Sequence, residues 1–143
     1  MGGWEEACAW NEQGEAGAGI ETMGILHFTL ATRDVRGTAE FFERTFGWRP
    51  VGRPSNIPMQ AAWLEIGGGQ ELHIVEAADF EPSGCEREYG RHIAVGYPKA
   101  EFDRLKGRLV AAGAELIAPA RETPHERFFF RERNGYVFEV IEA

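Results

Sequence analysis

The 143-residue sequence has few cysteines, few basic residues and no long apolar run. Its cysteines, Cys8 and Cys85, lack CxxC spacing, so they predict neither a disulfide scaffold nor a zinc knuckle. No stretch approaches the roughly 20 apolar residues of a membrane span. Lys and Arg number 15 against 23 Asp and Glu, and the formal charge of -8 disfavours nucleic acid and anionic membranes as partners. Since the N-terminal residues also lack a signal-peptide pattern, we expect a cytoplasmic protein.

The first 23 residues stand out as an acidic segment. They carry five glutamates and no Lys or Arg, which leaves the rest of the chain close to charge balance. Because chain termini are often poorly ordered, residues 1–23 are predicted to be an N-terminal extension of a single domain that spans residues 24–143.

The domain itself shows two similar halves. In the first, alternating apolar residues predict a strand at 25–31, helical spacing predicts a helix from 35 that Gly47 ends, and glycines predict a hairpin turn at 67–70. A linker at 78–90 follows, and the same order of elements then returns, ending in a hairpin around Asn134 and Gly135. The sequence therefore predicts an α+β fold of two βαβββ modules, at 24–77 and 91–142.

Histidines recur at equivalent positions of these modules. His73 follows His27 by 46 residues, and Glu139 follows His92 by 47. His73 and Glu139 also lie at the same step beyond their hairpin turns. Imidazole nitrogen and carboxylate oxygen are suitable ligands for divalent Ni, Zn, Mn, Co or Fe. We therefore expect these four side chains to line one cleft and to bind a divalent metal ion.

Glu71 lies two residues before His73 and, by strand alternation, points to the same face. It is an alternative to His73 as a ligand and a candidate general base. The fourth histidine of the chain, His125, is predicted to lie in a loop outside the site.

Other conspicuous residues are predicted to be structural. Arg127 and Arg131 flank the last hairpin, where guanidinium groups can bind an anion, but a solvated hairpin edge is the expectation. The aromatic residues Phe28, Trp63 and 128–130 are expected to pack in the core.

Four segments together resemble the vicinal oxygen chelate superfamily, which includes glyoxalase I, bleomycin and fosfomycin resistance proteins and extradiol dioxygenases. They read ILHFTLATRDVRGTAEFFERTFGW, AAWLEIGGGQELHIVE, RHIAVGYPKAEFDRLKGRLVAAGAELI and RFFFRERNGYVFEVIE. The resemblance implies a U-shaped, half-barrel mixed sheet around a metal-binding cleft, with helices outside. By this resemblance His27 and His92 match the first-strand histidines and Glu139 matches the closing glutamate. His73, in register with Glu139, is favoured over Glu71 as the fourth ligand.

The function that this resemblance implies is that of a glyoxalase-like, metal-dependent lyase or isomerase. It would act on a small oxygenated substrate chelated to the metal, with Glu139 and Glu71 as candidate groups for proton transfer. One alternative is a non-catalytic binding or antibiotic-resistance protein of the bleomycin-resistance type. Another is a ring-cleaving iron dioxygenase that uses His27, His92 and Glu139. Because modules of this type commonly pair across chains and leave strand edges exposed, a homodimer is expected.

Overall fold

The computed structural model describes residues 24–143, and the predicted acidic extension lies outside the described residues. The elements of the first module are β1 (His27–Thr32), α1 (Val35–Phe46), β2 (Arg49–Val51), β3 (Ala61–Gly67) and β4 (Gln70–Glu76). Those of the second are β5 (Ile93–Tyr97), the short 3-10 helix η2 (Lys99–Glu101), α2 (Phe102–Ala111), β6 (Glu115–Ile117), β7 (Arg127–Arg131) and β8 (Val137–Glu142). The predicted α+β fold of two βαβββ modules is confirmed. No helix within residues 24–143 is long and apolar enough to cross a bilayer.

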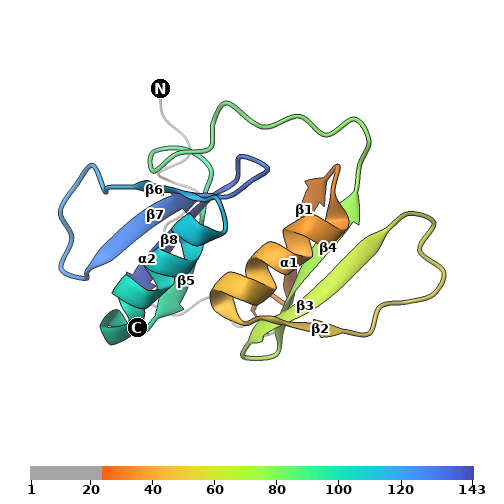
Figure 1. Ribbon diagram of the computed structural model, residues 1–143, viewed down its shortest axis with the longest axis horizontal. Coiled ribbons are helices and arrows are strands. Elements are labelled where there is room, and N and C mark those ends of the chain that lie inside the picture. The colour runs from red at the N-terminus through yellow and green to blue at the C-terminus, as the bar shows by residue number, and fades with distance from the viewer. Residues whose placement is uncertain (1–23) are drawn as a thin grey trace, which may run out of the picture.

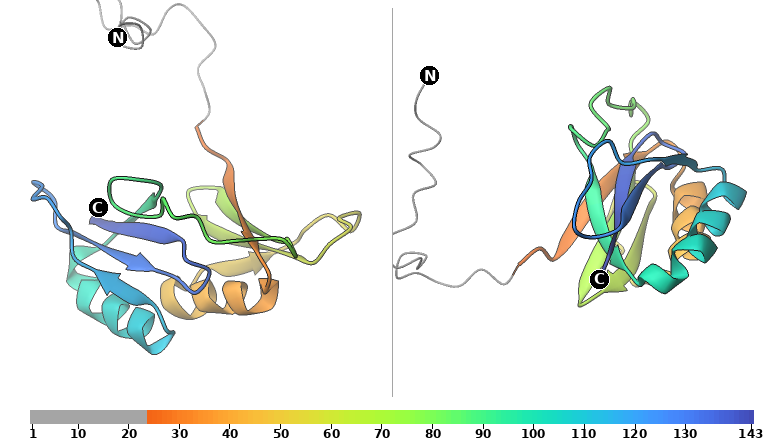
Figure 2. Two further views of the ribbon diagram at one scale, coloured as in Figure 1. Left: turned by 90° about the horizontal axis from the view of Figure 1, so that it is seen from above. Right: turned by 90° about the vertical axis from the view of Figure 1, so that its left-hand side faces the viewer.

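Each module contributes its own four-stranded mixed sheet. The strand orders are β1-β4-β3-β2 and β5-β8-β7-β6, and in each sheet the first strand pairs in parallel with the last. The sheets lie side by side, and α1 and α2 cover the same side of both (Figures 1 and 2). Thr29 is the partner of His73 and Ala94 is the partner of Glu139, so the predicted equivalence of His73 and Glu139 is present in the strand register.

Local sequence signals explain where the elements begin and turn. The Asp34 carboxylate accepts a hydrogen bond from the Gly37 N–H at 3.0 Å, which caps the free donors at the start of α1. The turn between β3 and β4 consists of Gly68 and Gly69, with φ of 61° and 78°. Positive φ at both central residues is what a two-residue hairpin turn requires, and glycine adopts it without strain.

The helix-facing sides of the two sheets share one hydrophobic core. Phe42 of α1 is fully buried and lies with its ring centroid 5.4 Å from that of Phe138 on β8. Phe46, also on α1, lies 5.8 Å from Phe130 on β7. The first helix therefore packs on the sheet of the second module as well as on its own, which ties the modules into one unit.

Two of the aromatic residues expected in this core lie elsewhere. Phe128 and Phe130 belong to the core and Phe28 packs against it, as predicted. Trp63 and Phe129 alternate with such core residues along their strands, so their side chains point to the opposite, helix-free face. The prediction of core packing is therefore wrong for Trp63, whereas Phe129 is buried, as expected, with 1% exposure.

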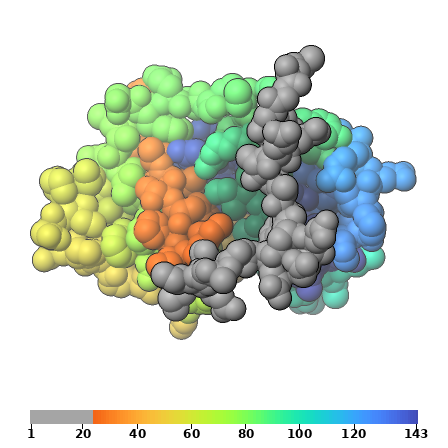
Figure 3. Space-filling view, turned by 180° about the vertical axis from the view of Figure 1, so that it is seen from behind, coloured from red at the N-terminus to blue at the C-terminus, as the bar shows by residue number. Residues whose placement is uncertain are grey.

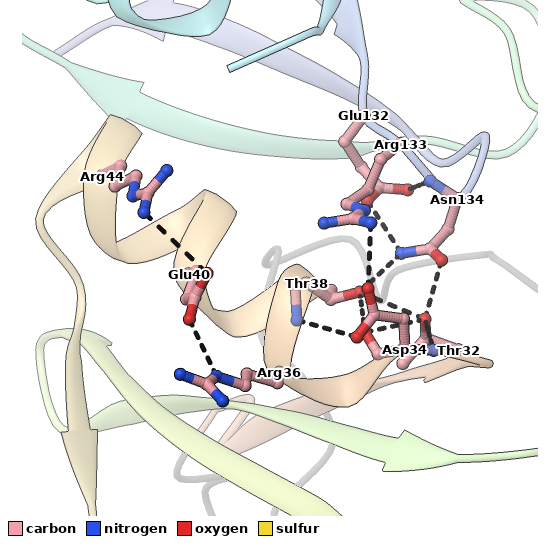
Figure 4. Close-up of polar contacts among 10 residues, drawn as sticks. Thr32, Asp34, Arg36, Thr38, Glu40, Arg44, Glu132, Arg133 and Asn134 are labelled. Carbon is pink, nitrogen blue, oxygen red and sulfur yellow. Dashed lines mark hydrogen bonds and ion pairs between the residues drawn. The ribbon is translucent and has the colours of Figure 1, made fainter.

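A polar network joins the modules where the β7–β8 turn meets the start of α1 (Figure 4). Asn134 accepts a hydrogen bond from Thr32 Oγ1 at 2.7 Å and donates through Nδ2 to Thr38 Oγ1 at 2.9 Å. The same Nδ2 donates to the buried carboxylate of Glu132 at 3.0 Å. Residues about 100 positions apart in the chain are thus held together by side-chain hydrogen bonds.

Candidate metal centre

The candidate ligands lie on the helix-free faces of the two sheets. On β4, Leu72 and Ile74 are buried in the core, and His73 between them points to the other side. On β8, Glu139 likewise alternates with two core residues. Strand alternation therefore places the polar residues of both modules away from the helices.

In the first module His73 is enclosed by aromatic rings and a carboxylate. Its ring stacks on Trp63 at 3.7 Å with an interplanar angle of 6°, and on His27 at 4.0 Å with an angle of 14°. Its Nε2 lies 2.7 Å from Glu71 Oε2, a hydrogen-bond distance. His73 is only 8% exposed, whereas His27 is an exposed residue at the beginning of β1.

This stack limits which histidine can bind a metal ion. A metal bound to an imidazole nitrogen lies close to the ring plane, so two nearly parallel rings 4.0 Å apart are poorly oriented to share one ion at bonds of about 2.0 to 2.1 Å. His73 also has its Nε2 engaged by Glu71. His27 is therefore the accessible nitrogen donor of the first module.

The second module holds an imidazole and a carboxylate close together. His92 Nε2 lies 3.2 Å from Glu139 Oε2, and the side chains are 24% and 11% exposed. Metal bonds of about 2.0 to 2.2 Å at ordinary coordination angles place neighbouring donor atoms about 2.8 to 3.6 Å apart. The distance and the nitrogen and oxygen donor set both fit a divalent metal ion. His92 Nδ1 is buried, and within residues 24–143 it has no hydrogen-bond partner.

Arg127 holds the other oxygen of Glu139. Its Nη1 donates to Glu139 Oε1 at 3.0 Å, while its Nη2 donates to Glu88 Oε1 and to the Arg121 carbonyl at 3.1 Å. The Arg127 side chain is only 4% exposed, so the expected solvated hairpin edge is wrong for this residue. Arg131, by contrast, is partly exposed and donates to the Gly135 carbonyl.

The charges around Arg127 stabilise one another. Burial opposes the charge of its guanidinium, but hydrogen bonds to Glu139 and Glu88 raise the pKa of Arg127 above its ordinary value. Burial likewise opposes ionisation of Glu88, yet the Ala120 N–H and Arg127 hold the pKa of Glu88 below its ordinary value. Arg127 thus lies between the Glu88 and Glu139 carboxyl groups and donates hydrogen bonds to both.

Within one chain, the four predicted ligands lie in two separate pairs. His27 meets His73, and His92 meets Glu139, but residues 24–143 contain no group of three or more His, Cys, Asp or Glu side chains placed to hold a metal ion. The expected convergence of all four side chains in a single coordination sphere thus is not present within residues 24–143 of one chain, and it stays a prediction for the assembled protein. His125 is exposed and lies 3.5 Å from Glu142.

Next to the first-module cluster, a groove of about 310 Å³ runs between β1 and β5. His27 and Glu71 line one side, and Ala94 and Gly96 line the other. The orange surface of β1 borders the teal surface of β5 in Figure 3. The groove gives a small molecule access to the exposed donor of the first module.

Sequence reasoning missed four residues of these clusters: Trp63, Glu88, Arg127 and Phe129. The internal repeat contains a signal for two of them, because Trp63 is the strand partner of His73 and Phe129 is the strand partner of Glu139. The contact between Glu88 and Arg127 spans 39 positions and has no local signal in the sequence.

Comparison with known proteins identifies the family of this chain. The family model of the Glyoxalase/Bleomycin resistance protein/Dioxygenase superfamily matches residues 24–140. The chain belongs to this superfamily. The resemblance drawn from the four sequence segments is therefore confirmed.

Two similar proteins are a metallothiol transferase and a glyoxylase I protein. The metallothiol transferase FosB of Shouchella clausii is 26% identical over 121 residues, which cover 82% of this chain and 78% of FosB. The Glyoxylase I 4 protein of Arabidopsis thaliana is 20% identical over 132 residues, which cover 88% of this chain and 74% of that protein.

Among solved structures, fosfomycin resistance protein FosX of Mesorhizobium loti superposes with a TM-score of 0.68 at 24% identity, covering 85% of this chain and 92% of its own. A FosX variant of Listeria monocytogenes, complexed with Mn(II) and a dihydroxypropylphosphonic acid, superposes with a TM-score of 0.71 at 22% identity. The match covers 86% of this chain and 94% of the FosX chain. These structures share the fold of this protein.

Proposed function

We propose that this protein is a metal-dependent enzyme of the glyoxalase type, a lyase or isomerase that acts on a small oxygenated substrate. The observation that carries the proposal is the pair of His92 and Glu139, whose donor atoms lie 3.2 Å apart in a largely buried setting. An imidazole nitrogen and a carboxylate oxygen at this distance are donor atoms suited to a divalent ion. The metal-containing relatives support the same proposal.

A second copy of the chain is the proposed source of the third protein ligand. His27 is exposed on β1, at the groove that β1 and β5 border. A homodimer that packs this face against a second copy can bring His27 of the partner subunit to His92 and Glu139. In this arrangement His73 is a support for His27 rather than a ligand, because its ring stacks on His27 and its Nε2 meets Glu71.

The metal supplies Lewis-acid polarisation of the substrate oxygens, which makes a neighbouring proton easier to remove. Glu71 is the proposed group for moving that proton. Its side chain is 37% exposed, it lines the groove beside His27, and its hydrogen bond to His73 fixes its position. Glu139 remains the second candidate for proton transfer if it leaves the metal during turnover.

The first experiment is metal analysis of the purified protein, followed by assays on methylglyoxal–thiol adducts, fosfomycin and catechols. We expect about one divalent ion per chain and turnover of an adduct or epoxide. Glu139→Gln should reduce turnover by about 10² to 10⁴-fold, as loss of a general base or ligand does. His125→Gln is the matched control and should retain activity, since His125 is exposed outside the clusters. Full turnover by the Glu139→Gln protein would exclude the catalytic proposal, and turnover of catechols alone would favour a dioxygenase.

Mixed dimers test whether two chains share each site. His27→Ala and Glu139→Gln proteins are each expected to bind metal weakly. When they are unfolded and refolded together in equal amounts, half of the dimers contain one chain of each kind, and each mixed dimer has one site with all its native ligands. Binding should return to about a quarter of the wild-type sites, as expected for a symmetric dimer with shared sites. If each site belongs to one chain, mixing restores none.

A further inference from the structure

We propose that Arg127 and Glu88 form a positioning pair for Glu139, and that Glu88 preserves the negative charge of the metal site by neutralising Arg127. The inference rests on the proposed function, in which Glu139 binds the metal. In this proposed site, Arg127 and Glu88 contact neither the metal nor the substrate, and they act only through Glu139.

The guanidinium of Arg127 holds Glu139 in one orientation. Arg127 Nη1 donates a hydrogen bond to Glu139 Oε1 at 3.0 Å. The other oxygen of Glu139, Oε2, therefore faces His92 Nε2 at 3.2 Å. Nη2 is fixed at the same time by Glu88 and by the Arg121 carbonyl. Because the guanidinium is planar and its donors have a fixed geometry, these contacts determine the direction in which Glu139 presents its free oxygen.

Phe129 connects Arg127 to the second ligand of the pair. The Arg127 guanidinium lies 5.1 Å from the centre of the Phe129 ring, and the ring of His92 meets Phe129 edge to face at 5.3 Å. Phe129 is only 1% exposed. One face of β7 therefore supports both the imidazole and the carboxylate, which keeps the two donors at a fixed separation.

The first module has no counterpart of this arginine. Arg127 is the strand partner of Ile141, and the equivalent pair in the first module is Ala61 and Val75. That module carries His73 where the second carries Glu139. The arginine thus occurs only in the module that has a carboxylate to hold, which separates its role from general sheet packing.

An arginine beside a metal-binding carboxylate also has a cost, because its positive charge repels the metal ion. Glu88 offsets this charge. It comes from the segment between β4 and β5, its side chain is 10% exposed, and the Ala120 N–H fixes it at 2.5 Å. Arg127 and Glu88 together are neutral, so the negative charge of Glu139 remains available to the metal.

Two variants of the full-length protein test the two parts of this proposal. Arg127→Lys keeps the positive charge but cannot hold Glu139, Glu88 and the Arg121 carbonyl at once. Glu88→Gln keeps the shape of the side chain but leaves the charge of Arg127 uncompensated. Glu115→Gln is the control, because Glu115 meets Arg131 at 3.6 Å in an exposed ion pair of the same sheet.

The measurements are Mn²⁺ titration by calorimetry at low and high salt, and the visible spectrum of the Co²⁺-loaded protein. We expect Arg127→Lys to weaken Mn²⁺ binding about 10 to 100-fold and to change the Co²⁺ spectrum, as loss of an outer-shell partner does. Glu88→Gln should also weaken binding, and more so at low salt, where the uncompensated charge of Arg127 is less screened. The control should bind within about twofold of wild type, the range of an exposed pair.

The outcomes separate this inference from the proposed function. A wild-type protein that binds no divalent metal overturns both. A wild-type protein that binds Mn²⁺, with both variants binding equally well and the Co²⁺ spectrum unchanged, overturns the positioning pair alone. If Arg127→Lys fails to fold, Glu88→Gln decides, since that substitution removes charge from a connecting segment and leaves the sheet intact.

Discussion

Replacing Asn134 by alanine should lower the free energy of unfolding, because it removes hydrogen bonds between the two modules. The hydrophobic core is unchanged by this substitution. Asn134 lies in the β7–β8 turn and joins Thr32 and Thr38 of the first module to Glu132 of the second (Figure 4). Thr32 and Thr38 are completely buried, and Glu132 is 2% exposed. Water therefore has little access to the groups that would lose their partner.

The expected loss follows from counting these hydrogen bonds. Each bond to a threonine hydroxyl contributes about 1 kcal/mol, and the bond to the Glu132 carboxylate contributes about 1.5 to 3 kcal/mol. The two hydroxyls still contact each other at 3.1 Å, which reduces their loss. Glu132 Oε1 keeps two backbone N–H donors, from Asn134 and Tyr136, but Oε2 loses the side-chain amide. We expect Asn134→Ala to lower the free energy of unfolding by about 2 to 4 kcal/mol.

Arg133→Ala provides the control within the same turn. Arg133 also contacts the first module, through an ion pair with Asp34 at 2.9 Å, but these side chains are 45% and 52% exposed. An exposed ion pair contributes less than about 1 kcal/mol. Urea unfolding followed by far-ultraviolet circular dichroism gives both values, measured at one protein concentration so that the proposed dimerisation does not affect the comparison.

An Asn134→Ala protein as stable as Arg133→Ala would contradict this prediction. That result would mean that the buried network contributes no more than an exposed ion pair. A Thr32→Val variant adds a second check, because its loss and that of Asn134→Ala should not add in the double variant if the two residues share one network.

Two further predictions concern stability. Burial raises the pKa of Glu132 despite hydrogen bonds from the backbone N–H groups of Tyr136 and Asn134. Because the folded protein then holds this proton more tightly than the unfolded chain, the contribution of Glu132 is greatest below the ordinary glutamate pKa and is lost as pH rises through the folded value. The stability of wild type relative to Glu132→Gln should therefore fall as pH rises from about 4 toward neutrality, and a pH-independent difference in urea unfolding would contradict this. Phe138→Ala should cost about 3 to 5 kcal/mol, since Phe138 is fully buried and stacks on Phe130 at 5.3 Å, and a thermal midpoint near that of wild type would show that this shared core is not what holds the modules together.

The order and type of the elements were predictable because they depend on local chemistry. Alternation of apolar residues, the helix end at Gly47 and the glycine hairpin turn act over a few residues, and each appears in the structure where the sequence indicates it. The internal repeat also predicted that His73 and Glu139 are equivalent, and in the structure they pair with the equivalent residues Thr29 and Ala94. Fold and ligand candidates could thus be inferred before the structure.

The arrangement of the side chains within the site was decided only by tertiary structure. Strand alternation allowed His27 and His73 to share a face, but the stack with Trp63 orients their rings so that they do not point at one ion. Burial of Arg127 between Glu88 and Glu139 depends on a segment distant in sequence, since a charge can be buried only where its partners are brought to it. Which residues lie on the helix-free face follows from the two-residue period of the strands, and this period can be read from the sequence. Ring orientation and charge pairing depend on contacts that form only when the sheets and their connecting segment have packed together.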